Sequence, residues 1–261
     1  MKIGFIGLGN MGGAIASGVV KSGLVPVENI CGFEPRAEHM AAFAAQTGIT
    51  PCATIQEAVA FADVVVIAVK PYVIENVLSG IREDLKGKAL VSVALGYDFK
   101  RLSALLDEST RVQFVMPNTP AMVGAGMLLF ESTNSLEAGE RAEIMNLFRA
   151  LGRVTEMPSH LMGIGGAVSG CGPAFCAMMI EALADAGVKY GLPRDVAYLL
   201  ASQTLSGTGK MQLETGMHPG VIKDGVCSPA GTTIRGVEAL ERAGLRAAML
   251  DAVQAVMEKE I

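Results

Sequence analysis

The chain has 261 residues, of which 51% are hydrophobic, and its formal net charge is −5. This composition is typical of a well-packed globular protein and excludes an intrinsically disordered one. The negative charge gives no electrostatic reason to expect nucleic acid or an anionic membrane surface as a partner. The length allows one large domain or two modest ones.

The five cysteines are scattered along the chain and include no C-x-x-C pair. We therefore expect neither a disulfide framework nor a metal site, and a reducing cytoplasm is the compartment that suits such a set. Residues 3–20 and 161–180 are uncharged and imitate a signal peptide and a membrane span. Both stretches are rich in glycine, so we assign them to close packing inside a soluble protein.

Residues 2–6 are expected to form a short buried strand that leads into Gly7-Leu8-Gly9-Asn10-Met11-Gly12 and then into a helix. This is the G-x-G-x-x-G fingerprint of dinucleotide binding in the context that it requires. Gly7 makes the tight turn, Gly9 lets a pyrophosphate approach the backbone, and Gly12 allows close packing of helix on strand. We predict a dinucleotide site on this loop.

A second strand, residues 29–33, ends in Glu34, where an acidic residue binds the adenosine ribose in such folds. A carboxylate at this point favours NADH, because it repels a 2′-phosphate. Arg36 is instead suited to bind that phosphate with two hydrogen bonds, or is a solvated charge at the start of a helix. The sequence alone does not decide between NADPH and NADH as the cofactor.

Helices and strands alternate through the rest of the first domain, for which we predict a doubly wound Rossmann-type sheet over residues 1–157. A strand is expected at residues 63–69, where the stretch after Asp63 is continuously apolar, as a strand buried on both faces requires. That strand ends at Lys70, at the carboxyl edge of the sheet where ligands bind, although a plain strand-end charge is the alternative. Further strands are expected around residue 49 and at 89–95, 112–116, 127–130 and 153–157, and helices at 37–47, 55–61, 74–85, 99–106 and 138–151.

The strand at residues 112–116 stops at Pro117-Asn118-Thr119-Pro120-Ala121. Two prolines around Asn and Thr make a rigid polar loop that is either a structural turn or a place from which side chains reach the ligand. Because the loop lies at the sheet edge, we predict that Asn118 belongs to the site.

Strand patterns stop after residue 158, and helices are expected at 167–188, 195–214, after 232 and at 245–260. We therefore predict an all-helical second domain over residues 158–261. Its faces carry many small and apolar side chains, and we expect a second copy of the chain to cover them. The predicted assembly is a homo-oligomer, at least a dimer through this domain.

The segment 223–233 combines charges, a Pro-Ala-Gly turn and a run of hydroxyls. A helix that begins near Thr232 would point free N–H groups and its positive dipole end at a ligand, which suits a small carboxylate. The hydroxyls of Thr232 and Thr233 could cap that helix or contact the ligand, and an ordinary capped turn is the alternative.

Taken together, these motifs make the chain resemble the pyrroline-5-carboxylate reductases, the last enzymes of proline biosynthesis, over nearly its whole length. The resemblance rests on the glycine loop and on four later motifs: residues 69–71, 116–121 and 169–174, and residues 218–220 leading to 228–233. The last motif is specific to this family, whereas many families share the glycine loop.

The resemblance implies reduction of 1-pyrroline-5-carboxylate to L-proline by hydride transfer from NAD(P)H to the ring imine carbon. The cofactor is expected to be NADPH, with NADH possible, and to lie on the glycine loop and against Ala68-Val69-Lys70-Pro71. The substrate carboxylate would be held around Ala230, Gly231 and Thr232 with help from Ser228, and Thr233 would face the imine nitrogen. Family members form dimers through the helical domain, some assembled into decamers. The chain departs from the usual residues at Leu95, Phe114, Cys171, Phe175 and Ala230, where Ala, Arg, Ser, Tyr and Gly are common.

None of the three histidines, His39, His160 and His218, is assigned as a general acid, because the imine nitrogen is partly protonated near neutrality. Thr233 as a hydrogen-bond partner, with water as the proton source, is the simpler hypothesis. A 3-hydroxyacid or 6-phosphogluconate-type dehydrogenase is the enzymatic alternative, but residues 163–172 lack the lysine it needs. The other alternative, a non-catalytic dinucleotide sensor, does not account for residues 228–233.

Overall fold

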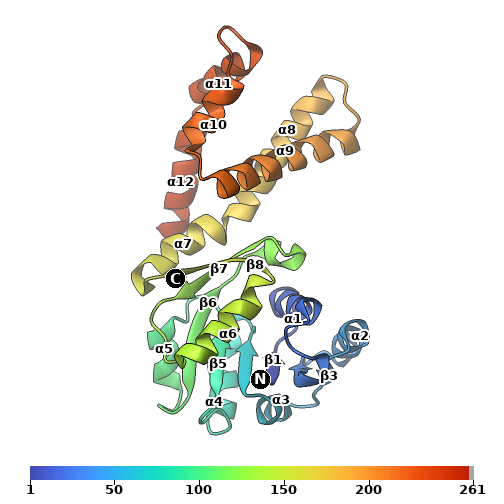
Figure 1. Ribbon diagram of the computed structural model, residues 1–261, viewed down its shortest axis with the longest axis vertical. Coiled ribbons are helices and arrows are strands. Elements are labelled where there is room, and N and C mark those ends of the chain that lie inside the picture. Colours follow the sequence, from blue (N-terminus) through green and yellow to red (C-terminus); the bar gives the residue numbers. More distant parts are fainter. Residues whose placement is uncertain (259–261) are drawn as a thin grey trace. The chain divides into compact units, whose positions relative to one another are not determined.

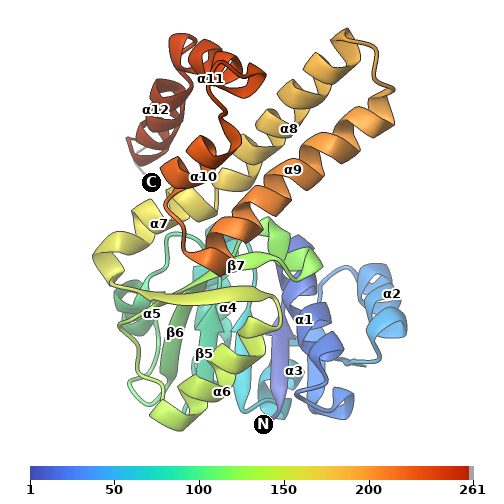
Figure 2. The same ribbon diagram turned by 45° about the horizontal axis from the view of Figure 1, so that its top comes forward.

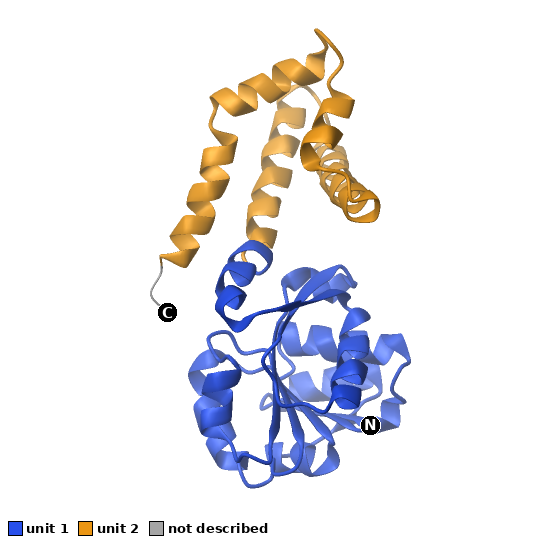
Figure 3. Ribbon diagram, turned by 60° about the vertical axis from the view of Figure 1, so that its left-hand side comes forward, with its two compact units in different colours: residues 1–170, 261 blue, residues 171–260 orange. Residues whose placement is uncertain are grey.

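The computed structural model describes residues 1–258 of the chain. It contains two compact units, Met1–Gly170 and a second that begins at Cys171 (Figure 3). The first unit extends past the expected boundary after residue 157, because helix α7 (Met162–Ser169) packs on strand β7 (Gly126–Glu131). This packing is close: a methyl group at Gly165 would lie 2.8 Å from Leu129 Cδ1.

The first unit is built on an eight-stranded sheet of order β3-β2-β1-β4-β5-β6-β7-β8 (Figure 1). Strands β1 to β6 are all parallel, and their order across the sheet, 3-2-1-4-5-6, is that of the Rossmann fold, which confirms the predicted fold class. Besides β7, the sheet contains β1 (Ile3–Ile6), β2 (Ile30–Phe33), β3 (Thr50–Pro51), β4 (Val64–Ile67), β5 (Ala89–Ser92), β6 (Arg111–Met116) and β8 (Gly152–Met157). Its other helices are α1 (Asn10–Ser22), α2 (Ala37–Thr47), α3 (Ile55–Phe61), α4 (Ile74–Ile81), α5 (Phe99–Leu105) and α6 (Ala138–Arg149).

The core of the first unit lies on both faces of the sheet. In β4, Val64 and Val66 join the cluster under α1 and α6, whereas Val65 and Ile67 join the cluster under α4 and α5. Alternate residues of a strand point to opposite faces, so a strand covered on both sides is apolar throughout. Each such side chain, fully buried, contributes on the order of 1.5–3 kcal/mol.

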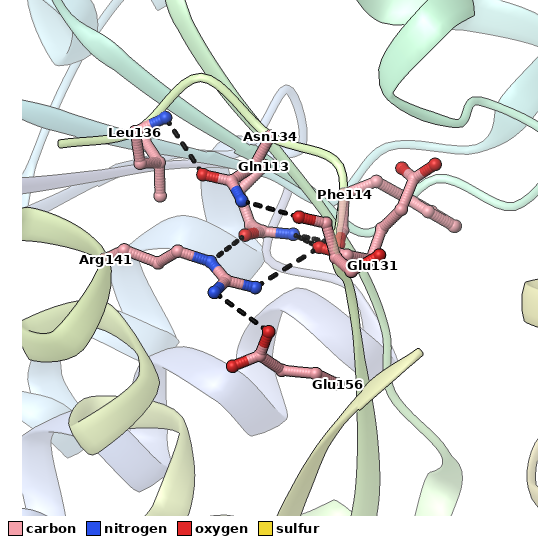
Figure 4. A network of polar contacts seen from close by, with 8 residues as sticks. Gln113, Phe114, Glu131, Asn134, Leu136, Arg141 and Glu156 are labelled. Carbon is pink, nitrogen blue, oxygen red and sulfur yellow. Dashed lines mark hydrogen bonds and ion pairs between the residues drawn. The ribbon is translucent and has the colours of Figure 1, made fainter. Parts of the chain in front are cut away.

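Strand β7 runs antiparallel to β6, so the sheet is mixed at this side. The two strands are joined only by the short 3-10 helix η3 (Thr119–Val123) and its flanks, and a parallel return needs a crossover of roughly a dozen residues or more. Figure 4 shows Arg141 of α6 beside Gln113, which is fully buried on β6, and Glu156 of β8. Arg141 donates to Gln113 Oε1 at 3.1 Å and to Glu156 Oε2 at 3.0 Å, and Gln113 donates to the Glu131 carbonyl at 2.9 Å. These bonds satisfy the polar groups buried at the reversal.

The second unit is all-helical, as predicted. Its helices are α8 (Gly172–Lys189), α9 (Arg194–Thr215), α10 (Pro219–Val226), α11 (Thr232–Arg242) and α12 (Leu245–Met257), and α8 and α9 pack as a hairpin (Figure 2). Among its described residues the buried core consists of Ala184, Ala197 and Ala201, whereas Leu199 and Leu250 are 67% and 72% exposed. So small a core does not by itself stabilise about ninety residues.

Two helical features differ from the prediction. Helix α10 was not expected, because Gly220 and Gly225 weaken its pattern, yet its start is well defined by Pro219 in the first turn and by the His218 ring, whose Nδ1 accepts from the Gly220 amide at 3.0 Å. The helix expected at 167–188 is interrupted at Gly170, which separates α7 from α8. By length and composition alone, the described residues include one stretch apolar enough to cross a membrane, Ser159–Lys189, in which an 18-residue window has a mean hydropathy of 1.5.

Candidate active site

The glycine loop has the backbone geometry that its sequence predicts. Gly7 has φ +89°, a conformation that side chains disfavour, and its amide donates to the Phe33 carbonyl at 2.9 Å. A methyl group at Gly12 would lie 2.0 Å from Gly7 O and 2.9 Å from Ala68 Cβ. Gly12 thus allows α1 to approach both the loop and the end of β4.

Gly9 has a different environment, because a methyl group added there would meet no atom within 4 Å. Gly9 is the N-cap of α1, and in the described part of the chain no side chain caps this helix. The first N–H groups of a helix have no partner within it and lie at its positive end, so an uncapped start favours an anion. The open cradle at Gly9, with the adjacent Asn10 and Met11 amides, fits a pyrophosphate.

Glu34 lies at the end of β2 and is 8% exposed. Its Oε2 accepts a hydrogen bond from the Leu8 amide at 3.1 Å, and its Oε1 accepts one from Arg36 Nε at 2.6 Å. Burial by itself raises the pKa of Glu34, but the hydrogen bonds from Arg36 and Leu8 outweigh it and hold the pKa below its ordinary value. The carboxylate is therefore charged at neutral pH and already compensated by donors of the chain itself.

Arg36 faces outward from this pair, with 65% of its side chain exposed. Its Nε is bound to Glu34, and the terminal guanidinium nitrogens make no hydrogen bond to any other described residue. A guanidinium held at one nitrogen and open at two others is preorganised for a phosphate.

The carboxyl end of β4 lies beside the glycine loop. A methyl group at Gly7 would lie 2.8 Å from Ala68 O and 3.2 Å from Val69 Cγ1, so these residues form the floor below the loop. Lys70 is exposed and precedes the 3-10 helix η2 (Pro71–Val73). Ala68, Val69, Lys70 and Pro71 thus follow the strand at the ligand edge, as the sequence predicts.

The side chain of Asn118 is engaged by the backbone of the first unit. Its Oδ1 accepts from the Met127 amide at 2.8 Å, and its Nδ2 donates to the Ser169 carbonyl at 2.9 Å. Asn118 therefore joins β7 and the end of α7 to the loop after β6. Its predicted contact with substrate stays a prediction, and the structure assigns it this bracing position in addition.

The second unit carries the other predicted cluster. Ser228, Pro229, Ala230 and Gly231 form a tight turn in which the Gly231 amide donates to the Ser228 carbonyl at 3.0 Å. Ala230, at the third position, has φ +57°, and with proline before it the turn is of type II, which favours glycine at that position. A methyl group at Gly231 would lie 2.5 Å from Ser228 Oγ, so the hydroxyl lies directly over the turn.

Gly231 is the N-cap of α11, and no side chain in the described part of the chain caps this helix. The predicted helix start at Thr232 is thus correct, and its threonines do not serve as caps. Thr232 and Thr233 are exposed, and the first amides of α11 lack helical partners. The turn therefore presents hydroxyls and free N–H groups together, which fits a small carboxylate.

His39 was assigned no role from the sequence, beyond a place on a surface helix. In the structure its Nε2 lies 2.8 Å from the carbonyl oxygen of Leu8, the central residue of Gly7-Leu8-Gly9. The two residues are 31 positions apart, so no local pattern signals this contact.

The sheet order, the uncapped glycine loop and the compensated acid after β2 define a dinucleotide-binding protein of the Rossmann class. The family described as "NADP oxidoreductase coenzyme F420-dependent" matches residues 2–96, and the one described as "Pyrroline-5-carboxylate reductase dimerisation" matches residues 159–261. The chain is 42% identical over 259 residues to the pyrroline-5-carboxylate reductase of Escherichia coli, covering 99% of this chain and 96% of the relative. It is 40% identical over 261 residues to that of Arabidopsis thaliana, covering 99% and 94%. The chain belongs to the pyrroline-5-carboxylate reductase family.

Solved structures agree over the same length. The Plasmodium falciparum pyrroline carboxylate reductase with NADP bound matches with a TM-score of 0.89 at 32% identity, covering 99% of this chain and 96% of that one. The Coxiella burnetii pyrroline-5-carboxylate reductase matches with a TM-score of 0.90 at 30% identity, covering 98% and 95%. A 3-hydroxyisobutyrate dehydrogenase of Mycobacterium tuberculosis shares the fold at a TM-score of 0.52 and 20% identity.

Proposed function

We propose that the chain reduces 1-pyrroline-5-carboxylate to L-proline with NADPH as the reductant, the final step of proline biosynthesis. The observation that carries the substrate assignment is the turn at residues 228–231, which leads directly into the uncapped start of α11. Family membership over 99% of the chain supports the same reaction. The dinucleotide supplies the hydride, and the chain supplies binding and position.

On the cofactor side, Gly9, Asn10 and Met11 offer backbone N–H groups to the pyrophosphate. Glu34 does not act as an uncompensated charge, because it already accepts from Leu8 and Arg36. The open nitrogens of Arg36 suit a 2′-phosphate, and this arrangement supports NADPH over NADH.

On the substrate side, the free amides at the start of α11 and the Ser228 hydroxyl hold the carboxylate. The Thr233 hydroxyl is exposed and donates to, or accepts from, the ring nitrogen of the imino acid. It orients the ring, and water supplies the proton. No histidine is needed for this step.

The functional form is a homo-oligomer, at least a dimer through the second unit, in the cytoplasm. The support is the small buried core of that unit beside exposed side chains such as Leu199 and Leu250. The dimerisation family that matches residues 159–261 supports the same assembly. We assign the apolar stretch Ser159–Lys189 to this contact between copies, with no membrane or nucleic acid as partner.

The test is oxidation of NADPH and, separately, of NADH, followed by absorbance with 1-pyrroline-5-carboxylate. Turnover establishes the reductase, and the ratio of the two kcat/KM values gives the cofactor preference. Thr233→Ala should lower kcat/KM for the imino acid at least about tenfold, and Thr233→Ser, which keeps the hydroxyl, should retain most of it. Full activity in Thr233→Ala would remove the role of Thr233, and no turnover by a protein that binds dinucleotide would remove the reductase assignment.

A further inference from the structure

The backbone of Leu8 is held from two sides by the second βα unit. Its amide donates to Glu34 Oε2 at 3.1 Å, and its carbonyl lies 2.8 Å from His39 Nε2. The Leu8 side chain is buried and packs against β2, where a methyl group at Gly32 would lie 2.9 Å from Leu8 Cδ1. The second βα unit thus contacts Leu8 at its amide, at its carbonyl and at its side chain.

The chemistry of the contact determines that His39 Nε2 carries a proton. A carbonyl oxygen only accepts, so Nε2 must carry the proton and donate. Both the neutral Nε2–H tautomer and the imidazolium meet this requirement, so the bond persists whether or not the ring is charged.

We propose that His39 is a positioning residue for the dinucleotide: together with Glu34 it clamps Leu8 and keeps the glycine loop in its binding conformation. The inference rests on the proposed function. Glycine has more backbone freedom than any other residue, so a loop with glycine on both sides of Leu8 samples other conformations unless Leu8 is fixed. The observed affinity is proportional to the fraction of time that the loop spends in its binding conformation. Loss of the clamp lowers that fraction and raises Kd by its inverse.

The clamp acts on the loop that binds the pyrophosphate, which NADPH, NADH and ADP-ribose all contain. Its loss must therefore weaken all three by the same factor. A residue that contacts the 2′-phosphate, as proposed for Arg36, changes NADPH alone. This difference separates positioning of the loop from direct contact with the ligand.

The experiment compares His39→Phe, which keeps an aromatic ring without a donor, with His39→Gln, which restores an N–H donor of similar reach. Dissociation constants are measured by titration for NADPH, NADH and ADP-ribose, and KM and kcat for the imino acid are measured at saturating NADPH. Glu38→Gln, an exposed change in the same turn of α2, is the matched control. We expect His39→Phe to raise all three dissociation constants about fivefold, the worth of one partly exposed hydrogen bond. His39→Gln should stay within about twofold of the wild type, and KM for the imino acid should not change.

Three outcomes overturn the clamp: unchanged binding in His39→Phe, equal weakening in His39→Phe and His39→Gln, or weakening confined to NADPH. Binding is measured without turnover, so these outcomes are distinct from failure of the proposed reaction. A wild-type protein that binds dinucleotide but does not reduce the imino acid would remove the proposed function and leave the clamp testable. A wild-type protein that binds none of the three ligands would remove both.

Discussion

Removal of the methyl group of Ala230 should stabilise the protein, whereas the same change at an ordinary helical alanine should destabilise it. Among the described residues it is the one non-glycine residue with positive φ, +57°, at the third position of the turn before α11. The same substitution, alanine to glycine, can be made at Ala239, an exposed position within α11. The same side chain is removed from a left-handed residue in one variant and from a helical residue in the other.

The magnitudes follow from that difference. An alanine in the left-handed region destabilises the folded state by on the order of 1–2 kcal/mol. Glycine, because it has more conformational freedom in the unfolded chain, destabilises the folded state by about 0.5–1 kcal/mol. Ala230→Gly should therefore increase the free energy of unfolding by roughly 0.5–1 kcal/mol. Ala239→Gly loses helix propensity with no strain to relieve and should decrease it by about 1 kcal/mol.

The assay is thermal unfolding of both variants and the wild type at one fixed protein concentration, because an oligomer's Tm depends on concentration. For a chain of this length the expected shifts are about +2 °C for Ala230→Gly and about −2 to −4 °C for Ala239→Gly. The KM for the imino acid, measured in parallel, reports whether the turn keeps its shape. A fall in Tm for Ala230→Gly as large as that for Ala239→Gly would show that the turn is not strained at Ala230, and the reasoning would be wrong.

Four other predictions concern the dinucleotide site. Gly9→Ala should fold with a Tm within about 2 °C of the wild type but bind NADPH at least about tenfold more weakly, because its methyl group meets only the space proposed for the pyrophosphate; near-normal NADPH titration would contradict this. Gly12→Ala should instead lose several kcal/mol of stability, on the order of overpacked cores, since its methyl group would lie 2.0 Å from Gly7 O; urea unfolding of the two variants side by side is the check. Arg36→Gln should raise KM for NADPH by about tenfold or more and change that for NADH little, and equal effects on both would exclude a 2′-phosphate contact. Hydrogen bonds from Arg36 and Leu8 hold the pKa of Glu34 below its ordinary value of 4.5, so its charge contributes stability that is fully present above pH 4.5 and is lost as the pH falls through the lower folded pKa. The difference in unfolding free energy between wild type and Glu34→Gln, measured in urea, should therefore shrink as the pH is lowered through that range. A difference independent of pH would refute this prediction.

Local pattern was sufficient for much of this protein. The glycine loop was identified by its spacing, and the apolar run predicted as a strand at residues 63–69 forms the strand Val64–Ile67, buried on both faces, because burial on two sides forbids alternation. The start of α11 after Pro229 and Gly231 was also predicted, because the proline ring restricts the backbone angles and glycine, without a side chain, allows a wider range of them. These features depend on residues within one turn or one strand of each other.

Only the tertiary structure decided which partners the polar side chains take. Glu34 reaches Leu8 across 26 positions, His39 reaches it across 31, and Asn118 reaches Ser169 across 51. Such contacts are set by the order in which strands and helices pack, which no window of sequence contains. The left-handed backbone of Ala230 was hidden for a related reason: alanine does not favour that conformation, and only the closure of the turn onto α11 imposes it.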